Sequence, residues 1–182
     1  MTTPGFAVFA TPIGPGAIAW NERGVVGVQL PEESETAARA RMRKRFPGAR
    51  ELAPPTDVAR AVAAVAALLA GEAIDLSFVV LDEERVEPFD RSVYAVARTI
   101  PPGATRTYGE IAKHLGDPRL ARAVGRALAR NPFPIVVPCH RILGAGAGLG
   151  GFSAPGGTKT KVRLLEIEGA ATGRTPSLFG DD

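Results

Sequence analysis

The sequence of 182 residues contains few cysteines, histidines and aromatic residues and no long apolar run, and these shortages exclude several classes of protein. It contains one cysteine, so no disulfide can form within the chain. One cysteine and two histidines are too few for a zinc site of the Cys/His type, and we expect no metal. Aromatic residues make up 6% of the chain, and no apolar run approaches the length of a membrane span.

The net charge of the chain is small, and its first residues show no secretory signal. The formal net charge of +3 permits binding to a polyanion but does not demand it. Residues 1–20 lack a basic segment followed by an apolar run, which is the pattern of a secretory signal. Together with the single cysteine, these features predict a protein of the reducing cytoplasm.

Basic residues are concentrated in one stretch, between positions 91 and 141, where few acids accompany them. Such clustering is typical of a surface that contacts phosphates. The residues concerned are Arg98, Arg106, Lys113, Arg119, Arg122, Arg126 and Arg130. A second cluster, at 41–45, lies on a predicted helix, and we interpret it as a solvated face rather than as a nucleic-acid site.

In the first half, short apolar runs alternate with glycine and proline, which predicts consecutive antiparallel strands. The predicted strands cover 6–10, 16–20, 25–30 and 75–80. Helices are predicted over 33–46 and 57–69. The acidic, aperiodic segment around 81–88 predicts a linker.

The second half is predominantly helical in its pattern. Helices are predicted over 89–99, 107–115 and 119–130, with a last one ending near Glu168. The second and third are joined by Gly116-Asp117-Pro118, which is the outline of a helix-turn-helix. Residues 170–182 are rich in Gly, Ser, Pro and Asp and predict a frayed tail.

Without regard to its neighbours, a single cysteine such as Cys139 is more typical of an inert core residue than of a nucleophile. Its neighbours favour a nucleophile, because Pro138 fixes the backbone before it and the polar pair His140 and Arg141 follows an apolar run. If this segment is extended, adjacent side chains point to opposite sides, so His140 needs a water relay or a sharp turn to act on Cys139. Either Glu166 or Glu168 is a candidate to orient the imidazole.

Several motifs resemble, in order and spacing, the O6-alkylguanine-DNA alkyltransferases, also called methylated-DNA–protein-cysteine methyltransferases. The resemblance runs from about residue 89 to residue 168. Its motifs are Ile100-Pro101-Pro102-Gly103, Thr107-Tyr108-Gly109-Glu110, Ala121-Arg122-Ala123-Val124-Gly125, Asn131-Pro132, Pro138-Cys139-His140-Arg141-Ile142 and Leu164-Leu165-Glu166-Ile167-Glu168. In the N-terminal half only the coarse α/β outline is similar.

The resemblance implies direct, single-use repair: Cys139 takes the alkyl group from O6-alkylguanine in DNA, with no cofactor. Glu168 would orient His140, which draws the proton from Cys139 through water, and Tyr108 would assist the departure of guanine. Asn131 would hold the cysteine loop, while Pro138 and Arg141 would support it structurally. The partner would be double-stranded DNA bound by a monomer through the minor groove, with the base flipped out; cooperative binding and action on O4-alkylthymine stay open.

The helix predicted over 119–130 is the recognition helix of the helix-turn-helix, and the resemblance assigns its Arg122 to the space that the flipped base leaves. The small residues Ala121, Ala123 and Gly125 suit a narrow groove, and Arg119 adds a basic flank. Helix packing also explains an Ala/Gly run, but the arginines within this run favour DNA.

The sequence departs from the common family pattern at several positions. Phe152 stands where many members carry tyrosine, and Ala145 replaces a common serine. Leu120 is bulkier than usual, and the 151–161 loop is slightly longer. These departures concern the range of alkyl groups that the protein accepts and its affinity for DNA.

The expected fold is an α/β N-terminal domain (1–84) with a small antiparallel sheet and helices, ribonuclease H-like, followed by a mainly α C-terminal domain (88–169) with a helix-turn-helix, winged-helix-like. Three other classes of protein are alternatives. A lesion sensor of the alkyltransferase-like type carries another residue at the cysteine position. A cysteine hydrolase needs a directly contacting base and an oxyanion hole, and a transcription factor has no use for the cysteine motif.

Overall fold

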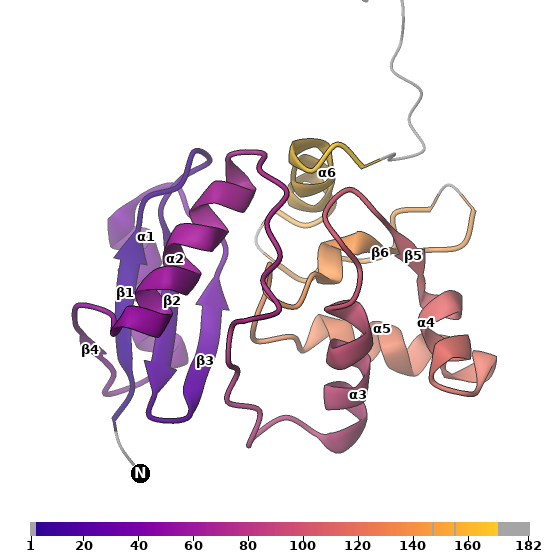
Figure 1. The fold of residues 1–182 in the computed structure, drawn as a ribbon, viewed down its shortest axis with the longest axis horizontal. Coiled ribbons are helices and arrows are strands. Elements are labelled where there is room, and N and C mark those ends of the chain that lie inside the picture. The colour runs from indigo at the N-terminus through magenta and orange to yellow at the C-terminus, as the bar shows by residue number, and fades with distance from the viewer. Residues whose placement is uncertain (1–2, 147, 155, 171–182) are drawn as a thin grey trace, which may run out of the picture.

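The computed structural model describes residues 3–146, 148–154 and 156–170, and a four-stranded sheet organises its N-terminal half (Figure 1). The strand order is β3-β2-β1-β4, with antiparallel pairing among the first three and a parallel pairing of β4 with β1. The strands are β1 (Gly5–Phe9), β2 (Gly16–Asn21), β3 (Gly24–Gln29) and β4 (Arg50–Glu51). The three predicted strands of this region are therefore confirmed, while the two-residue β4 was not predicted.

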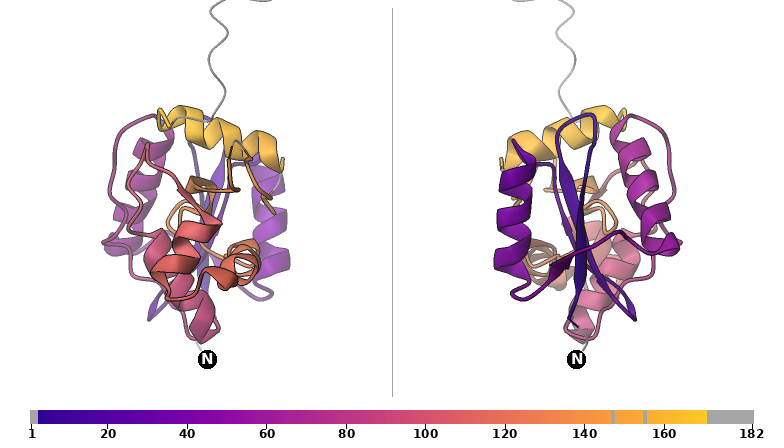
Figure 2. Two further views of the ribbon diagram at one scale, coloured as in Figure 1. Left: turned by 90° about the vertical axis from the view of Figure 1, so that its right-hand side faces the viewer. Right: turned by 90° about the vertical axis from the view of Figure 1, so that its left-hand side faces the viewer.

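The two faces of the sheet pack against different helices, α1 (Glu35–Arg45) and α2 (Thr56–Leu69), which lie on opposite sides of it (Figure 2). Alternate residues of a strand point to opposite faces. Accordingly, Ala17 and Ala19 pack with Met42 of α1, whereas Ile18 and Trp20 pack into the larger core that contains the buried side of α2. Both helices match their predicted ranges closely.

The C-terminal half is built from four helices and a short parallel strand pair, β5 (Arg106–Thr107) with β6 (Ile142–Leu143). The helices are α3 (Pro88–Ala97), α4 (Tyr108–His114), α5 (Ala121–Ala129) and α6 (Thr158–Ile167). All four were predicted, but the strand pair was not. None of the helices in the described ranges has the length and apolarity that crossing a membrane requires.

Local chemistry accounts for the arrangement of α4 and α5. At the start of α4, the Thr107 hydroxyl accepts a hydrogen bond from the Glu110 backbone N–H, and the Glu110 carboxylate accepts one from the Thr107 N–H, a complete capping box. Gly116, whose φ of 100° suits glycine, ends α4, and a 3-10 turn at Pro118–Leu120 leads into α5. The two helices contact each other, as the predicted helix-turn-helix requires.

One predicted strand is absent and the apolar run before Cys139 is not extended, and both corrections have a physical reason. Residues 75–80 form an irregular segment with a turn at 77–78, because the Asp75 carboxylate accepts hydrogen bonds from Ser77 and the Arg98 guanidinium donates to the carbonyls of residues 76, 77 and 79. The apolar segment before Cys139 is likewise not a strand. It turns tightly at Ile135, whose φ is 74°, and its apolar side chains are buried in the core.

One hydrophobic core spans both halves of the chain. It includes Val28 and Val65 from the N-terminal half and Val93 and Val137 from the C-terminal half. Irregular backbone at 82–87 joins the halves, in agreement with the predicted linker. The boundaries 1–84 and 88–169 stay a prediction, and the predicted tail lies, apart from Ala170, outside the described residues.

Candidate active site

Cys139 begins a 3-10 turn, Cys139–Arg141, rather than continuing an extended segment. The turn follows Pro138 and is stabilised by a hydrogen bond from the Arg141 N–H to the Pro138 carbonyl, 2.9 Å long. The sharp turn that the sequence left as one alternative is therefore present. The extended geometry, with adjacent side chains on opposite sides, is wrong for this segment.

Asn131 ties the preceding loop to the cysteine. Its side-chain oxygen accepts a hydrogen bond from the Phe133 N–H at 2.9 Å, and its amide nitrogen donates to the Val137 carbonyl at 3.0 Å. The same Val137 carbonyl accepts the Cys139 N–H at 2.8 Å. Asn131 thus holds the carbonyl to which the backbone of Cys139 is bonded.

Glu168, at the C-terminal end of α6, brings His140 and Arg141 together. Its carboxylate lies 2.8 Å from His140 Nε2 and accepts hydrogen bonds from Arg141 Nε at 2.9 Å and Nη2 at 2.7 Å. The Arg141 guanidinium also donates to the Ile100 carbonyl at 2.6 Å. Of the two candidate orienting carboxylates, the structure places Glu168 at the imidazole, whereas Glu166 is exposed.

The electrostatics of this cluster favour an ionised carboxylate beside a neutral imidazole. Burial by itself raises the pKa of Glu168, but the hydrogen bonds from His140 and Arg141 outweigh it and lower this pKa to about 2. Burial lowers the pKa of His140, against the opposing attraction of Glu168. A neutral imidazole that donates from Nε2 to Glu168 has its acceptor lone pair on Nδ1.

His140 Nδ1 is buried, and within the described part of the chain it has no protein hydrogen-bond partner. Buried polar atoms are nearly always paired, so an unpaired one points to a functional role. With Nε2 committed to Glu168, Nδ1 is the atom that remains to accept a proton. The site therefore contains a base whose orientation is fixed by a carboxylate.

Lys161, on α6, is a site residue that the sequence reasoning missed. It is fully buried, and its ammonium donates to the carbonyls of Ile142 at 2.6 Å and Gly151 at 3.4 Å. Burial lowers its pKa to about 8, against the attraction of the Cys139 thiolate. Burial raises the pKa of Cys139, while the hydrogen bond from Asn131 and the charge of Lys161 lower it. A lysine in a helical pattern gives no signal of burial, which explains the omission.

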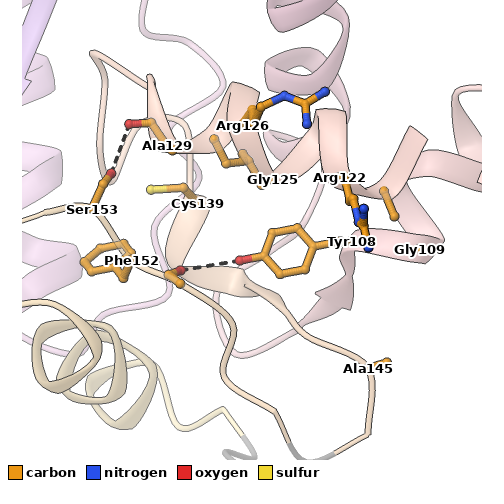
Figure 3. A pocket seen from close by; sticks show the side chains of 13 residues that line it. Tyr108, Gly109, Arg122, Gly125, Arg126, Ala129, Cys139, Ala145, Phe152 and Ser153 are labelled. Atoms are coloured by element: carbon orange, nitrogen blue, oxygen red, sulfur yellow. Dashed lines mark hydrogen bonds between the residues drawn. The ribbon is translucent and has the colours of Figure 1, made fainter. Parts of the chain in front are cut away.

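A cavity of about 860 Å³ opens in front of Cys139 (Figure 3). The cavity is lined by Tyr108, Gly109, Ala121, Arg122, Gly125, Arg126, Leu128, Ala129, Cys139, Ala145, Gly151, Phe152 and Ser153. Most of these side chains are small or apolar. The cavity thus gives a small group access to the thiol through a mainly apolar lining.

Tyr108 and Phe152 place aromatic rings at this cavity. The Tyr108 hydroxyl donates to the Gly151 carbonyl at 3.4 Å, and burial, followed by the nearby Cys139 charge, raises the pKa of Tyr108. The tyrosine therefore stays protonated and able to donate. Gly150, with a φ of 70°, is required beside it, because a Cβ atom there would lie 2.6 Å from the tyrosine oxygen.

The basic residues of this half have two different surroundings. Arg122 and Arg126 of α5 are exposed at the cavity. By contrast, Arg130 pairs with the buried carboxylate of Asp90 at 2.8 Å, and Arg98 is committed to loop carbonyls. These two arginines make contacts that stabilise the fold, and the phosphate-contacting surface expected from the sequence stays a prediction.

Two further expected DNA-contacting residues lie beside the cavity without lining it. Arg119 is 89% exposed and is held by Asp117 at 2.9 Å. Ala123 lies on α5 and is half-buried. Ala121 and Gly125, by contrast, contribute directly to the cavity wall. The described residues contain no cluster of three or more His, Cys, Asp or Glu side chains suited to a metal ion.

The chain is similar to one family of proteins along most of its length. Residues 88–170 match the family described as 6-O-methylguanine DNA methyltransferase, DNA binding domain. The methylated-DNA–protein-cysteine methyltransferase of Methanosarcina acetivorans is 37% identical over 172 residues, which cover 91% of this chain and 98% of that protein. The Mycobacterium tuberculosis protein of the same name is 36% identical, with coverages of 93% and 94%.

Solved structures agree with these sequence matches. Mycobacterium tuberculosis OGT in complex with DNA superposes with a TM-score of 0.70 at 33% identity, covering 91% of this chain and 92% of that one. The O6-methylguanine-DNA methyltransferase of Pyrococcus kodakaraensis gives a TM-score of 0.68 at 31% identity, with coverages of 92% and 99%. The likeness therefore includes the N-terminal half, where the sequence motifs were weak.

The Glu168 cluster makes stability depend on pH. Because the pKa of Glu168 is about 2 in the folded protein and ordinarily 4.5, its contribution is fully present above about pH 4.5 and is lost as the pH falls toward 2. We expect Glu168→Gln to lower the free energy of unfolding at pH 7 by about 3 kcal/mol, because it leaves the buried Arg141 charge unpaired. Urea unfolding at pH 7 and pH 3 measures this effect, and the gap from wild type should shrink at pH 3. Glu166→Gln, on the same helix but exposed, is the control; a pH-independent gap for Glu168→Gln would contradict the prediction.

Lys161 is expected to favour the Cys139 thiolate. Lys161→Met should shift the pKa of the Cys139 thiol upward, because it removes a buried positive charge. The pH profile of thiol alkylation by iodoacetamide checks this, with the exposed Lys159→Met as the matched control. In the unsubstituted protein, the effect of Lys161 should decline above about pH 8, where its ammonium loses the proton. Identical profiles for the Lys161 and Lys159 variants would refute this role.

Proposed function

This chain belongs to the methylated-DNA–protein-cysteine methyltransferase family, and from that premise we propose that Cys139 is its alkyl acceptor. The protein binds DNA and repairs it by direct transfer of the alkyl group of O6-alkylguanine to a cysteine of its own. The sequence contains a single cysteine, and that cysteine lines the cavity described above. This one observation carries the assignment.

The proton of the thiol passes to His140 in the proposed reaction. Glu168 holds Nε2, so Nδ1 accepts the proton through an intervening water, and the imidazolium that results is stabilised by the Glu168 carboxylate. Lys161 favours the thiolate that remains. Removal of the proton before attack matters because the thiolate, rather than the thiol, is the nucleophile.

The transfer itself exchanges one bond for another. The sulfur of Cys139 attacks the alkyl carbon in line with the leaving oxygen, the S–C bond forms, and the C–O6 bond breaks. Guanine leaves with the electron pair, assisted by a hydrogen bond from Tyr108, and its anion then gains the proton that the thiol lost. The thioether is stable, and no second thiol in the sequence can displace it, so each molecule acts once.

The target base reaches the thiol by leaving the duplex. Inside the stack, O6 is inaccessible to a protein side chain, so the nucleotide is flipped into the cavity. In the proposed complex, α5 lies in the minor groove, Arg122 fills the space of the missing base, and Ala121, Ala123 and Gly125 permit close approach. All of these residues belong to one chain, which supports a monomer as the active unit; cooperative binding along DNA is not part of the proposal.

Two finer features of the fold are also proposals. We propose that the N-terminal sheet with its helices is ribonuclease H-like and that the α4–α5 region is winged-helix-like. The mixed sheet flanked by α1 and α2, and the short β5–β6 pair near the helix-turn-helix, support these assignments.

The alternatives fit the site less well. A lesion sensor has no acceptor thiol, whereas here Cys139 opens onto the cavity. A cysteine hydrolase needs a base in direct contact with the nucleophile, whereas among the described residues neither Cys139 nor any other side chain is hydrogen-bonded to His140 Nδ1. Direct transfer is the reaction that uses the cavity, the Cys139 thiol and the Glu168–His140 pair together.

Single-use transfer predicts a defined mass change. Incubation with duplex DNA that contains O6-methylguanine should add one methyl group, located on Cys139, and no more than one equivalent should react. Intact mass followed by peptide mapping measures this. Cys139→Ala should bind the same duplex and stay unmodified. Repeated turnover, or a methyl group on another residue, would show that the proposed function is wrong.

Arg122 should matter for duplex DNA more than for the free base. Arg122→Ala should slow transfer from an O6-methylguanine duplex by about tenfold or more, because the side chain that replaces the flipped base is lost. Reaction with the free O6-methylguanine base should change little. Single-turnover rates with both substrates test this, with Arg43→Ala on α1 as the control; equal losses on both substrates would contradict the role.

A further inference from the structure

Arg45, the last residue of α1, makes hydrogen bonds that join the N-terminal half to the loop before Cys139. Its Nη1 donates to the Val28 carbonyl at 2.7 Å and lies 3.2 Å from the Gln29 side-chain oxygen. Its Nη2 donates to the Pro132 carbonyl at 3.2 Å. Two branches of one guanidinium therefore reach β3 and the cysteine loop at the same time.

The surroundings of Arg45 differ from those of a solvated arginine. Among the described residues, the oxygens that accept its hydrogen bonds are all neutral. Burial, followed by repulsion from Arg41, lowers the pKa of Arg45. Gly27 leaves room for the Phe46 ring and for Arg45, because a Cβ atom at that position would lie 2.5 Å from the ring and 3.0 Å from Nη2. The interpretation of this basic cluster as a solvated face is thus wrong for Arg45.

A charge that is partly removed from water and has no acidic partner is costly, and hydrogen bonds to carbonyl oxygens must offset that cost. The other basic residues of α1 avoid the cost, since Arg39 and Arg41 pair with acids and Arg43 is 65% exposed. The bonds of Arg45 are consequently a distinct feature of this helix.

The bonds continue from Arg45 to the nucleophile through two shared carbonyls. The Pro132 carbonyl accepts both Arg45 Nη2 and the Val28 N–H, the latter at 2.9 Å. The neighbouring Asn131 donates to the Val137 carbonyl, which also accepts the Cys139 N–H. A fixed Pro132 carbonyl therefore fixes the turn from which Asn131 reaches the cysteine.

We propose that Arg45 is a positioning residue for alkyl transfer: it holds the Asn131-Pro132 turn against β3 and thereby sets the position of Cys139. The inference rests on the proposed function, because the reaction that it adjusts is transfer to Cys139. Arg45 acts through Asn131 and does not touch the substrate. Its removal loosens the cysteine loop and leaves the α4–α5 surface that binds DNA in place.

The test separates the transfer step from DNA binding. We expect Arg45→Met to slow single-turnover methyl transfer roughly two- to thirtyfold, the range for residues that couple through such networks. The Kd for duplex DNA should stay within about twofold of wild type, and the pH profile of Cys139 alkylation by iodoacetamide should shift. Arg45→Lys keeps the charge but loses the two-branched guanidinium, so its transfer rate should lie between those of wild type and Arg45→Met.

Arg43→Met is the matched control, since it removes an exposed arginine from the same helix. An unchanged transfer rate and thiol profile in folded Arg45→Met, or a loss no greater than that of the control, would overturn the proposal. If Arg45→Met does not fold, Arg45→Lys decides by the same criteria. The wild-type protein in the same assay distinguishes the two levels of inference, because a wild type that takes up no methyl group contradicts the proposed function itself.

Discussion

The carboxylate of Glu168 is the interaction on which the rest of the site depends. It is 2% exposed and is shared by His140 and Arg141, two consecutive residues of the turn that Cys139 begins. Because a single acid holds both neighbours, the turn, the tautomer of the imidazole and the end of α6 are fixed together. An apolar residue in place of Glu168 would leave a buried guanidinium without a counter-charge, which is far more costly than the loss of an exposed ion pair.

Buried or half-buried cations organise irregular parts of the chain. Arg98 donates to three carbonyls of the 76–79 segment, Arg45 to the turn before the cysteine, and Lys161 to the loop that follows it. In each case a side chain supplies donors to the backbone carbonyls of a loop or turn. This is how segments with strand-like composition remain ordered without joining a sheet.

The sequence predicted those elements whose pattern is local. Three strands and six helices follow from periodicity and from proline and glycine. The strand predicted over 75–80 failed because apolar composition does not distinguish a buried turn from a strand, and Arg98, a distant residue, decides between them. The two-residue strands are too short to leave a pattern.

The site shows the same division. The motif around Cys139 could be read directly, and its spacing indicated Glu168 as one of two candidate partners for His140. Lys161 and Arg45 could not be found in this way, because a lysine or arginine within a helix gives the same pattern whether it faces water or carbonyl oxygens. Their roles depend on contacts with residues 19 and 87 positions away, Ile142 and Pro132.

The position of α6 in the chain has a consequence for biosynthesis. Both Lys161 and Glu168 lie at the end of the described sequence, whereas Cys139 and His140 precede them. While the polypeptide is being made, the thiol therefore emerges from the ribosome before the residues that orient its base and favour its ionisation. The nucleophile and the residues that orient its base are therefore assembled into one site only when the last helix docks.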